Sequence, residues 1–276
     1  MTKQNIINKI SSFVKESESN FVSKEKALSP NLAGMKIFDT PLVAFGSATD
    51  ALFLKMKAPE VIGDHFLLPT EWLANAKTII SIFCPFTEST KESNKKDMSW
   101  PSLEWLHSRV EGQTFVNNLC LFLKSELKLA GYDAAVPLVD SRFISVKDEP
   151  VVLDNRKLSF TSNWSERHVG FVCGLGTFGL TKGLITEKGS AGRMGSVVTS
   201  LEITPDTRKY NSIYEHCTIC GKCIKNCPAH AITKEQGKNH SICSAFLDKV
   251  AEKHKPWHGC GKCQVDVPCE KGKNKI

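Results

Sequence analysis

Apolar residues recur at helical spacing in two parts of the chain. The stronger pattern spans 102–133, with apolar positions three or four residues apart at Val116, Leu119, Cys120, Leu123, Leu127 and Ala130. Gly131 follows and suits the position just beyond a helix end. Residues 1–30 carry a weaker, more polar version that Pro30 and Gly34 interrupt. The pattern predicts a long, partly buried helix over 102–133 and a polar helix over 1–30.

Short apolar runs bounded by turn residues predict strands between these helices. The expected strands are 40–48, 78–84, 133–139, 183–186 and 195–203. A short helix is expected from Pro69, and another from Ser165 to Val172 with Gly174 as its stop. The polar stretch 88–99 is predicted to be an exposed loop. This mixture of helices and strands favours α+β or α/β packing.

The composition is that of an ordinary globular protein. The 276 residues are 41% hydrophobic and 24% charged, which suffices for one large domain with a smaller one, or for two medium domains. The opening "MTKQNIINKI" lacks the apolar core of a secretory signal, and the longest apolar runs are too short to cross a bilayer. We therefore expect a cytoplasmic protein that makes no membrane contact.

Cysteine is the residue type that most needs an explanation. The chain has 11 cysteines, and eight of them lie between Cys217 and Cys269. Disulfides are disfavoured in the cytoplasm, so a dense block of cysteines there indicates metal binding. The other three, Cys84, Cys120 and Cys173, are scattered among apolar residues.

The first half of the cysteine block has the spacing of a bacterial ferredoxin. The stretch "HCTICGKCIKNCPAHAI" reads C-x2-C-x2-C-x3-C-P, in which three cysteines hold one 4Fe–4S cluster and the fourth reaches another. The second half contains Cys243, then Cys260-x2-Cys263, then Cys269. Zinc is the rival metal, but the tight triplet is unlike the separated pairs of zinc ribbons.

Eight cysteines are enough for two clusters with none left over. In two-cluster ferredoxins each run lends its last cysteine to the other cluster, which predicts the partition here. Set A is Cys217, Cys220, Cys223 and Cys269, and set B is Cys227, Cys243, Cys260 and Cys263. Cys243 is expected in a helix that buries Ile242, Phe246 and Val250.

The formal net charge of +7 invites a nucleic-acid partner, but the clusters weaken that interpretation. Two clusters with their thiolates would remove roughly four positive charges, because a bound ion's own charge belongs in the sum. Nucleic acid is therefore a disfavoured partner. Pro205 and Asp206 mark the expected boundary between a domain over 1–205 and a cluster domain over 206–276.

The larger domain contains the glycine array "GLGTFG", with Gly174, Gly176 and Gly179. A dinucleotide fingerprint needs a strand before the array and a helix after it. Here a helix is predicted before it and a strand soon after, so NAD binding is disfavoured. The glycines either form tight turns or let the backbone approach a large ligand.

These segments together resemble a known family. "ERHVGFVCGLGTFGLTKGLIT", then "GRMGSVVTSLEI", then the cysteine block are similar to the core of epoxyqueuosine reductase, and "LPTEWLANAKTIISIFCPF" resembles its upstream segment. The resemblance covers roughly 65–270, and reductive dehalogenases are relatives. It implies an α+β fold, with a nitroreductase-like α/β sandwich before a ferredoxin-like domain. It also implies a cobalamin that receives electrons from the two clusters and reduces a substrate that the sequence does not identify.

The resemblance and the local chemistry together suggest residues for the cofactor site. We expect cofactor contacts from Arg167, His168, Gly174, Gly176, Gly179 and Arg193. The family's proton-donating aspartate is matched here by Phe160. Asp140 and Asp154 are candidate replacements because they lie nearby in sequence, and His168 is a third candidate. Glu166 and Arg167 either hold the cofactor or pair with each other.

Two alternatives share this scaffold. A two-cluster electron-transfer protein would serve a partner and perform no substrate chemistry of its own, and the missing aspartate favours it. A reductase that binds FMN is the third possibility. The enzyme would need a low-potential donor such as ferredoxin or flavodoxin, and its acceptor would be a small molecule or a partner protein. A large cavity would favour the enzyme over the carrier, because a corrinoid needs a site at the top of the usual size range or beyond.

Overall fold

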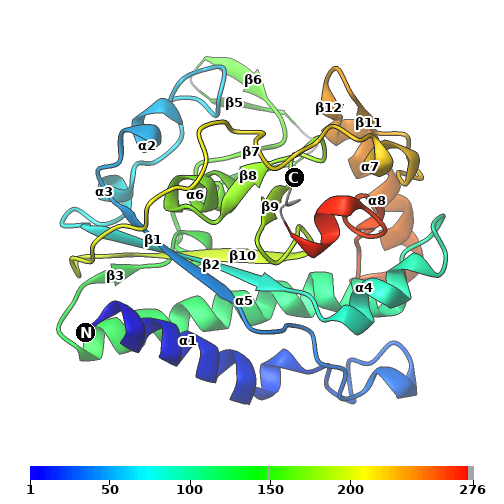
Figure 1. Ribbon diagram of the computed structural model, residues 1–276, viewed down its shortest axis with the longest axis horizontal. Coiled ribbons are helices and arrows are strands. Elements are labelled where there is room, and N and C mark those ends of the chain that lie inside the picture. Colours follow the sequence, from blue (N-terminus) through cyan, green and yellow to red (C-terminus); the bar gives the residue numbers. More distant parts are fainter. Residues whose placement is uncertain (148–149, 154, 273–276) are drawn as a thin grey trace.

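A four-stranded antiparallel sheet forms the centre of the protein. The computed structural model describes residues 1–147, 150–153 and 155–272. The strand order is β1-β2-β10-β3, where β1 is Leu42–Ser47, β2 is Thr78–Pro85, β10 is Gly192–Thr199 and β3 is Ala134–Ala135. Helices cover both faces, so the larger part of the chain is a layered α+β structure (Figure 1).

Strand β2 runs through the middle of the core and is buried at every residue. Alternate side chains point to opposite faces of a strand, and β2 follows this rule. Ile80 and Ile82 belong to the apolar cluster on one face, whereas Ile79 and Phe83 belong to the cluster on the other. This double burial explains why the sequence shows a continuous apolar run rather than alternation.

Helix α5 (Leu103–Leu129) packs on one face of the sheet, and α1 (Lys3–Glu16) packs against α5 (Figure 1). The Ser102 hydroxyl accepts a hydrogen bond from the amide of Trp105 at 3.2 Å and caps the start of α5. Gly131 follows its end with a φ of +84°. The prediction of a long helix over 102–133 is confirmed.

The other face of the sheet carries α6 (Glu166–Cys173), together with α2 (Ala51–Lys55) and α3 (Pro69–Trp72). Helix α6 ends at Gly174, whose φ of +99° lies in the left-handed region that glycine adopts without strain. The predicted start after Ser165 and the stop at Gly174 are both confirmed.

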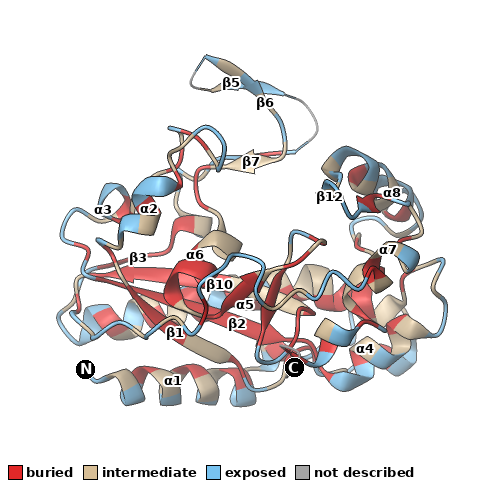
Figure 2. Cartoon of the chain, turned by 45° about the horizontal axis from the view of Figure 1, so that its top comes forward, coloured by how far each residue is buried: buried red, intermediate tan, exposed pale blue. Residues whose placement is uncertain are grey.

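Apart from α8, the remaining elements are short, and they lie in both the sheet domain and the cysteine-rich segment. In Figure 2 the hairpin of β5 and β6 projects from the rest of the chain. These elements are η1 (Glu18–Asn20), η2 (Pro30–Leu32), α4 (Glu88–Lys95), η3 (Pro137–Val139), β4 (Ser145–Val146), β5 (Val151–Leu153), β6 (Arg156–Leu158), β7 (Thr161–Ser162), β8 (Gly176–Phe178), β9 (Leu184–Thr186), α7 (Lys222–Lys225), β11 (Ile232–Thr233), β12 (Gly237–Lys238), α8 (His240–His254), η4 (Lys262–Gln264) and η5 (Pro268–Lys271).

Four sequence predictions differ from the structure. The strand predicted over 133–139 is two residues long, Ala134–Ala135, and a 3-10 helix, Pro137–Val139, follows it. The loop predicted over 88–99 is wrong, because α4 forms there, capped by the Thr87 hydroxyl. The first helix ends at Glu16 rather than continuing toward residue 30. In α8, Val250 is buried as predicted, but Ile242 is 47% exposed.

The cysteine-rich segment packs against the sheet domain rather than standing apart. Gln264 donates a hydrogen bond from Nε2 to the carbonyl of Ser190 at 2.7 Å, and Trp257 donates from Nε1 to Glu111 of α5 at 2.8 Å. The division at 205/206 therefore stays a prediction, with an extensive contact between the two parts. None of the helices in the described parts of the chain is long and apolar enough to span a membrane.

Candidate functional site

Set A surrounds a small cavity near the surface. Cys217, Cys220, Cys223 and Cys269 all line a cavity of about 20 Å³, together with Gly179 of the glycine array. The sequence separates Cys269 from the other three by more than forty residues, and the η5 turn returns it to them. The structure therefore brings together the four cysteines that the ferredoxin rule assigns to one cluster.

The thiols of set A act on one another electrostatically. Burial, together with the charges of Cys269, Cys217 and Cys220, raises the pKa of Cys223 to about 11. Burial likewise raises the pKa of Cys269 to about 11, with Cys217 the largest charge acting on it. Several thiolates so close together are stable only when a cation neutralises them, which is what iron ligation provides.

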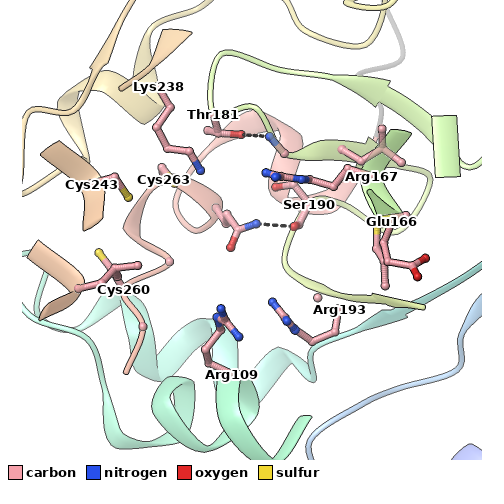
Figure 3. Close-up of a pocket in the computed structure, with 18 of the residues that line it drawn as sticks. Arg109, Glu166, Arg167, Thr181, Ser190, Arg193, Lys238, Cys243, Cys260 and Cys263 are labelled. Carbon is pink, nitrogen blue, oxygen red and sulfur yellow. Dashed lines mark hydrogen bonds between the residues drawn. The ribbon is translucent and has the colours of Figure 1, made fainter. Parts of the chain in front are cut away.

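Set B lines a much larger cavity between the sheet domain and the cysteine-rich segment. This cavity has a volume of about 490 Å³, and Cys227, Cys243, Cys260 and Cys263 all contribute to its wall. Helix α8 carries Cys243, and Cys260 and Cys263 flank the start of η4. We call it the central cavity (Figure 3).

The thiols of set B are buried more deeply than those of set A. Burial raises the pKa of Cys260 and of Cys263 to about 12, and the charge of Cys243 adds to both rises. The ammonium group of Lys238 opposes the rise at Cys263 and at Cys243. Lys238 therefore favours thiolates at Cys243 and Cys263, and Lys262 does so at Cys260.

Helix α4 holds the Cys260 segment through polar contacts. Asn94 donates from Nδ2 to the carbonyl of Cys260 at 3.0 Å and accepts at Oδ1 from the Lys262 ammonium at 2.8 Å. Lys262 is fully buried, and burial lowers its pKa to about 8. The buried face of α4 is polar because it binds this segment, which explains why the stretch resembles a loop in sequence.

Gly261 fits against the indole ring of Trp105. Its φ is +69°, and a Cβ added there would lie 1.9 Å from Cε2 of Trp105. Trp105 itself is buried and packs edge-on against Phe86, with ring centroids 5.0 Å apart. The backbone between Cys260 and Cys263 can therefore approach α5 only where a side chain is absent.

Replacing Gly261 with alanine is expected to destabilise the holoprotein by about 2–4 kcal/mol, because the new methyl group combines backbone strain with overpacking. Thermal unfolding and iron retention would measure the effect. The matched control is Gly34→Ala, since Gly34 has a φ of +79° but nothing within 4 Å of an added Cβ. Equal losses in the two variants would show that contact with Trp105 contributes nothing.

Three arginines face the central cavity from different elements. Arg109 comes from α5, Arg167 from α6 and Arg193 from β10, and all three line the cavity. Figure 3 shows their guanidinium groups directed toward one space, with Cys243 and Cys260 across from them. Burial lowers the pKa of each arginine, and for Arg109 and Arg193 the charge of Arg167 lowers it further.

Glu166 is the single acidic residue lining the central cavity among the described residues. Its Oε1 accepts a hydrogen bond from the Ser196 hydroxyl at 3.0 Å, and its Oε2 is buried without a partner. Burial raises its pKa from 4.5 to about 7. The Glu166 carboxyl is turned away from the three guanidinium groups (Figure 3). Glu166 and Arg167 thus do not pair with each other, and of the two expectations for them only a contact with the cofactor stays a prediction.

Sequence comparison finds reductive dehalogenases. The chain is 37% identical over 89 residues to a tetrachloroethene reductive dehalogenase of Desulfitobacterium hafniense, which covers 31% of this chain and 16% of that protein. It is 42% identical over 64 residues to that of Dehalobacter restrictus, which covers 23% and 12%. The chain thus matches less than a fifth of the length of these relatives. No family profile matches.

Structure comparison finds the same group of enzymes. The epoxyqueuosine reductase of Streptococcus thermophilus aligns with a TM-score of 0.51 at 19% identity, over 100% of this chain and 68% of that one. A catabolic reductive dehalogenase aligns with a TM-score of 0.55 at 12% identity, over 99% and 37%. Part of this chain is similar in sequence to reductive dehalogenases, and the whole chain shares the fold of epoxyqueuosine reductases. The resemblance stated from the motifs is confirmed.

Within this reductase fold, the glycine array has two different surroundings. Gly174 ends α6, and a Cβ on Gly176 would lie 2.1 Å from the carbonyl oxygen of Ile185 in the neighbouring strand. Gly179 instead lines the set A cavity, where an added Cβ would lie 3.7 Å from Sγ of Cys217. Tight turns and close strand packing therefore account for the first two glycines.

Two of the proton-donor candidates, Asp140 and His168, do not line the central cavity. Asp140 follows η3 and pairs with the guanidinium of Arg142, which lowers the Asp140 pKa to about 2. His168 hydrogen-bonds the Ser165 hydroxyl at 2.7 Å, and burial lowers its pKa to about 4. Neither residue is among those lining the cavity. Asp154 lies outside the described residues.

Sequence reasoning missed four cavity or support residues. Arg109 and Lys238 line the central cavity, and Asn94 with Lys262 positions Cys260. Arg109 falls among the apolar positions of a long helix and Lys238 in a polar turn, so neither carries a spacing signal. Lys262 lies between two predicted ligands, Cys260 and Cys263, and this location was the one available hint.

Proposed function

We propose that this protein is an iron–sulfur reductase in which sets A and B each hold a 4Fe–4S cluster and the central cavity holds the electron acceptor, a cobalamin. The observation that carries the proposal is the placement of the two cysteine sets. One set lies at the surface and the other opens into a cavity, on a fold shared with reductases. The substrate beyond the cobalamin is not identified by the geometry.

The chain supplies a surface at set A and an enclosed environment at set B. When bound, the two clusters supply one-electron transfer between the protein surface and the central cavity. Cys220 is exposed, and Ile219 and Tyr214 beside it are 51% and 52% exposed. An external donor, ferredoxin or flavodoxin, would dock there, and exposed Lys225 would attract its acidic surface.

The lining of the central cavity suits a corrinoid in its chemistry. Phe143, Leu184 and Met194 offer apolar surface for a flat ring, whereas Gln113 and Thr181 offer polar groups for amides at its rim. Three buried polar atoms on the wall have no partner among the described residues: Nε of Arg193, Oγ of Ser190 and Oε2 of Glu166. Such atoms need a ligand or water. The residues that line the central cavity therefore have the chemical character that a corrinoid requires.

The volume of the central cavity limits how much of a corrinoid it can hold. At about 490 Å³ it lies within the range of about 300–1,000 Å³ for small-molecule sites. A corrinoid exceeds such a volume, so part of one would occupy the cavity. When bound, cobalamin supplies cobalt-centred reduction chemistry, which the chain can support by excluding water and orienting the ligand.

The second candidate is a two-cluster electron-transfer protein that serves a partner. A carrier needs no concave site, and the central cavity with its unpaired arginines argues against it. If the protein were instead a reductase that binds FMN, the FMN would occupy the same cavity.

The test is to prepare the holoprotein anaerobically with cobalamin and separate the bound from the free cofactor. We expect about one corrinoid per chain, whose absorption changes when limiting dithionite is added. The Cys263→Ser variant should bind corrinoid without this rapid change, because set B is incomplete. Full cluster content with neither corrinoid nor flavin bound would establish the carrier instead.

A further inference from the structure

The central cavity carries more positive charge than one bound cluster, with a charge of about −2, would balance. Four cations line it, Arg109, Arg167, Arg193 and Lys238, against the single carboxyl of Glu166. The Glu166 carboxyl is turned away (Figure 3), and burial favours its neutral form by raising its pKa to about 7. Burying like charges together is costly unless an opposite charge joins them.

The three arginines are poorly satisfied by the protein itself. Nη1 of Arg167 donates to the carbonyl of Lys182 at 2.9 Å, and Nη2 of Arg193 donates to Gln113. Nε of Arg193 is buried without a partner. Across the described ranges, none of the three guanidinium groups forms a salt bridge with an acid.

The arginines are also not the principal counter-charge of set B. Lys238 lies on the same side of the cavity as Cys243 and Cys263 (Figure 3). The arginines lie across the cavity from Cys243 and Cys260 (Figure 3). Their charge is therefore available to a molecule placed between them and the cysteines.

We propose that Arg109, Arg167 and Arg193 bind a carboxylate or phosphate group of the substrate, so that this reductase acts on an anionic molecule. The inference rests on the proposed function, because it assigns the substrate class of the same cavity. Guanidinium groups match oxyanions through paired N–H donors, and three of them on separate elements fix both position and orientation. Helix α5, helix α6 and strand β10 are all anchored to the sheet, so the group is held in place before the substrate arrives.

The test uses inorganic phosphate as the probe and the anaerobically prepared, cluster-loaded protein. Calorimetric titration in chloride of constant ionic strength should show one saturable site with a Kd below about 1 mM, because several charge-assisted contacts form at once. Constant ionic strength keeps general screening fixed. Phosphate should also raise the unfolding temperature.

Two variants and one control decide whether the arginines are responsible. Arg193→Gln and Arg109→Gln should each weaken phosphate binding at least about tenfold and remove the thermal shift, while iron content stays full. Lys128→Gln removes an exposed charge from the same helix as Arg109 and should leave both unchanged. Using two variants guards against the misfolding of one of them.

Three results would overturn the proposal. The first is the absence of saturable phosphate binding. The second is binding that both arginine variants retain. The third is displacement of phosphate by one equivalent of cobalamin, which would assign the arginines to the phosphodiester of the cofactor rather than to the substrate. Each can occur with full iron and corrinoid content, so failure here is distinguishable from failure of the proposed function.

Discussion

Replacing Cys263 with serine is expected to remove one cluster and leave the other. Cys263 lines the central cavity with Cys227, Cys243 and Cys260, and all four are needed to complete a cluster. Iron should therefore fall from about eight to about four per chain. The unfolding temperature should fall by on the order of 10 °C, because ligation links α8 and η4 and contributes to folding.

The control for this variant is Cys120→Ala. Cys120 lies in α5 and is buried in the main core, away from both cysteine sets. Its replacement should cost about 1 kcal/mol for the lost packing and retain all the iron. If Cys263→Ser kept full iron and full stability, the assignment of Cys263 to set B would be refuted.

Replacing Glu166 with glutamine is expected to change how stability depends on pH. The folded-state pKa of about 7 lies above the ordinary 4.5, so the native protein holds a proton that the unfolded chain releases. Stability should therefore fall as pH rises from about 4.5 to about 7, and the loss should be complete above that. A difference of this size corresponds to roughly 3 kcal/mol.

The glutamine variant lacks this proton, so its stability should not fall across that interval. Its unfolding temperature at pH 8 should exceed that of the wild type by roughly 5–10 °C, with little difference at pH 4.5. Glu60→Gln, which removes an exposed carboxyl, should follow the wild type at both pH values. An unchanged pH dependence in Glu166→Gln would show that this carboxyl is ionised in the native state.

The parts of the fold that follow from local pattern could be predicted from sequence. The buried run of β2, the long amphipathic helix α5 and the glycine stop of α6 each carry a local signal that the structure confirms. Helix α4 could not be predicted, because its buried face is polar. Asn94 contributes to the structure through hydrogen bonds to Cys260 and Lys262 rather than through apolar contact.

The candidate site was predictable to a different extent in its two parts. Ligand spacing is a local property, so the two cysteine sets followed from the motif, and the structure brings each set to its own cavity. The cavity wall depends on long-range packing. Arg109 and Arg193 come from α5 and β10, and no spacing rule relates them. The sequence analysis placed Arg167 and Arg193 at the site. It did not predict Arg109, so it did not predict the excess of positive charge in the central cavity.

The most direct test of the central claim is the cluster content of the anaerobically purified protein. The account predicts about eight iron and eight sulfide per chain, with two magnetically interacting signals in the electron paramagnetic resonance spectrum after full reduction. About four iron per chain, or zinc in place of iron, would contradict the assignment of two 4Fe–4S clusters to sets A and B.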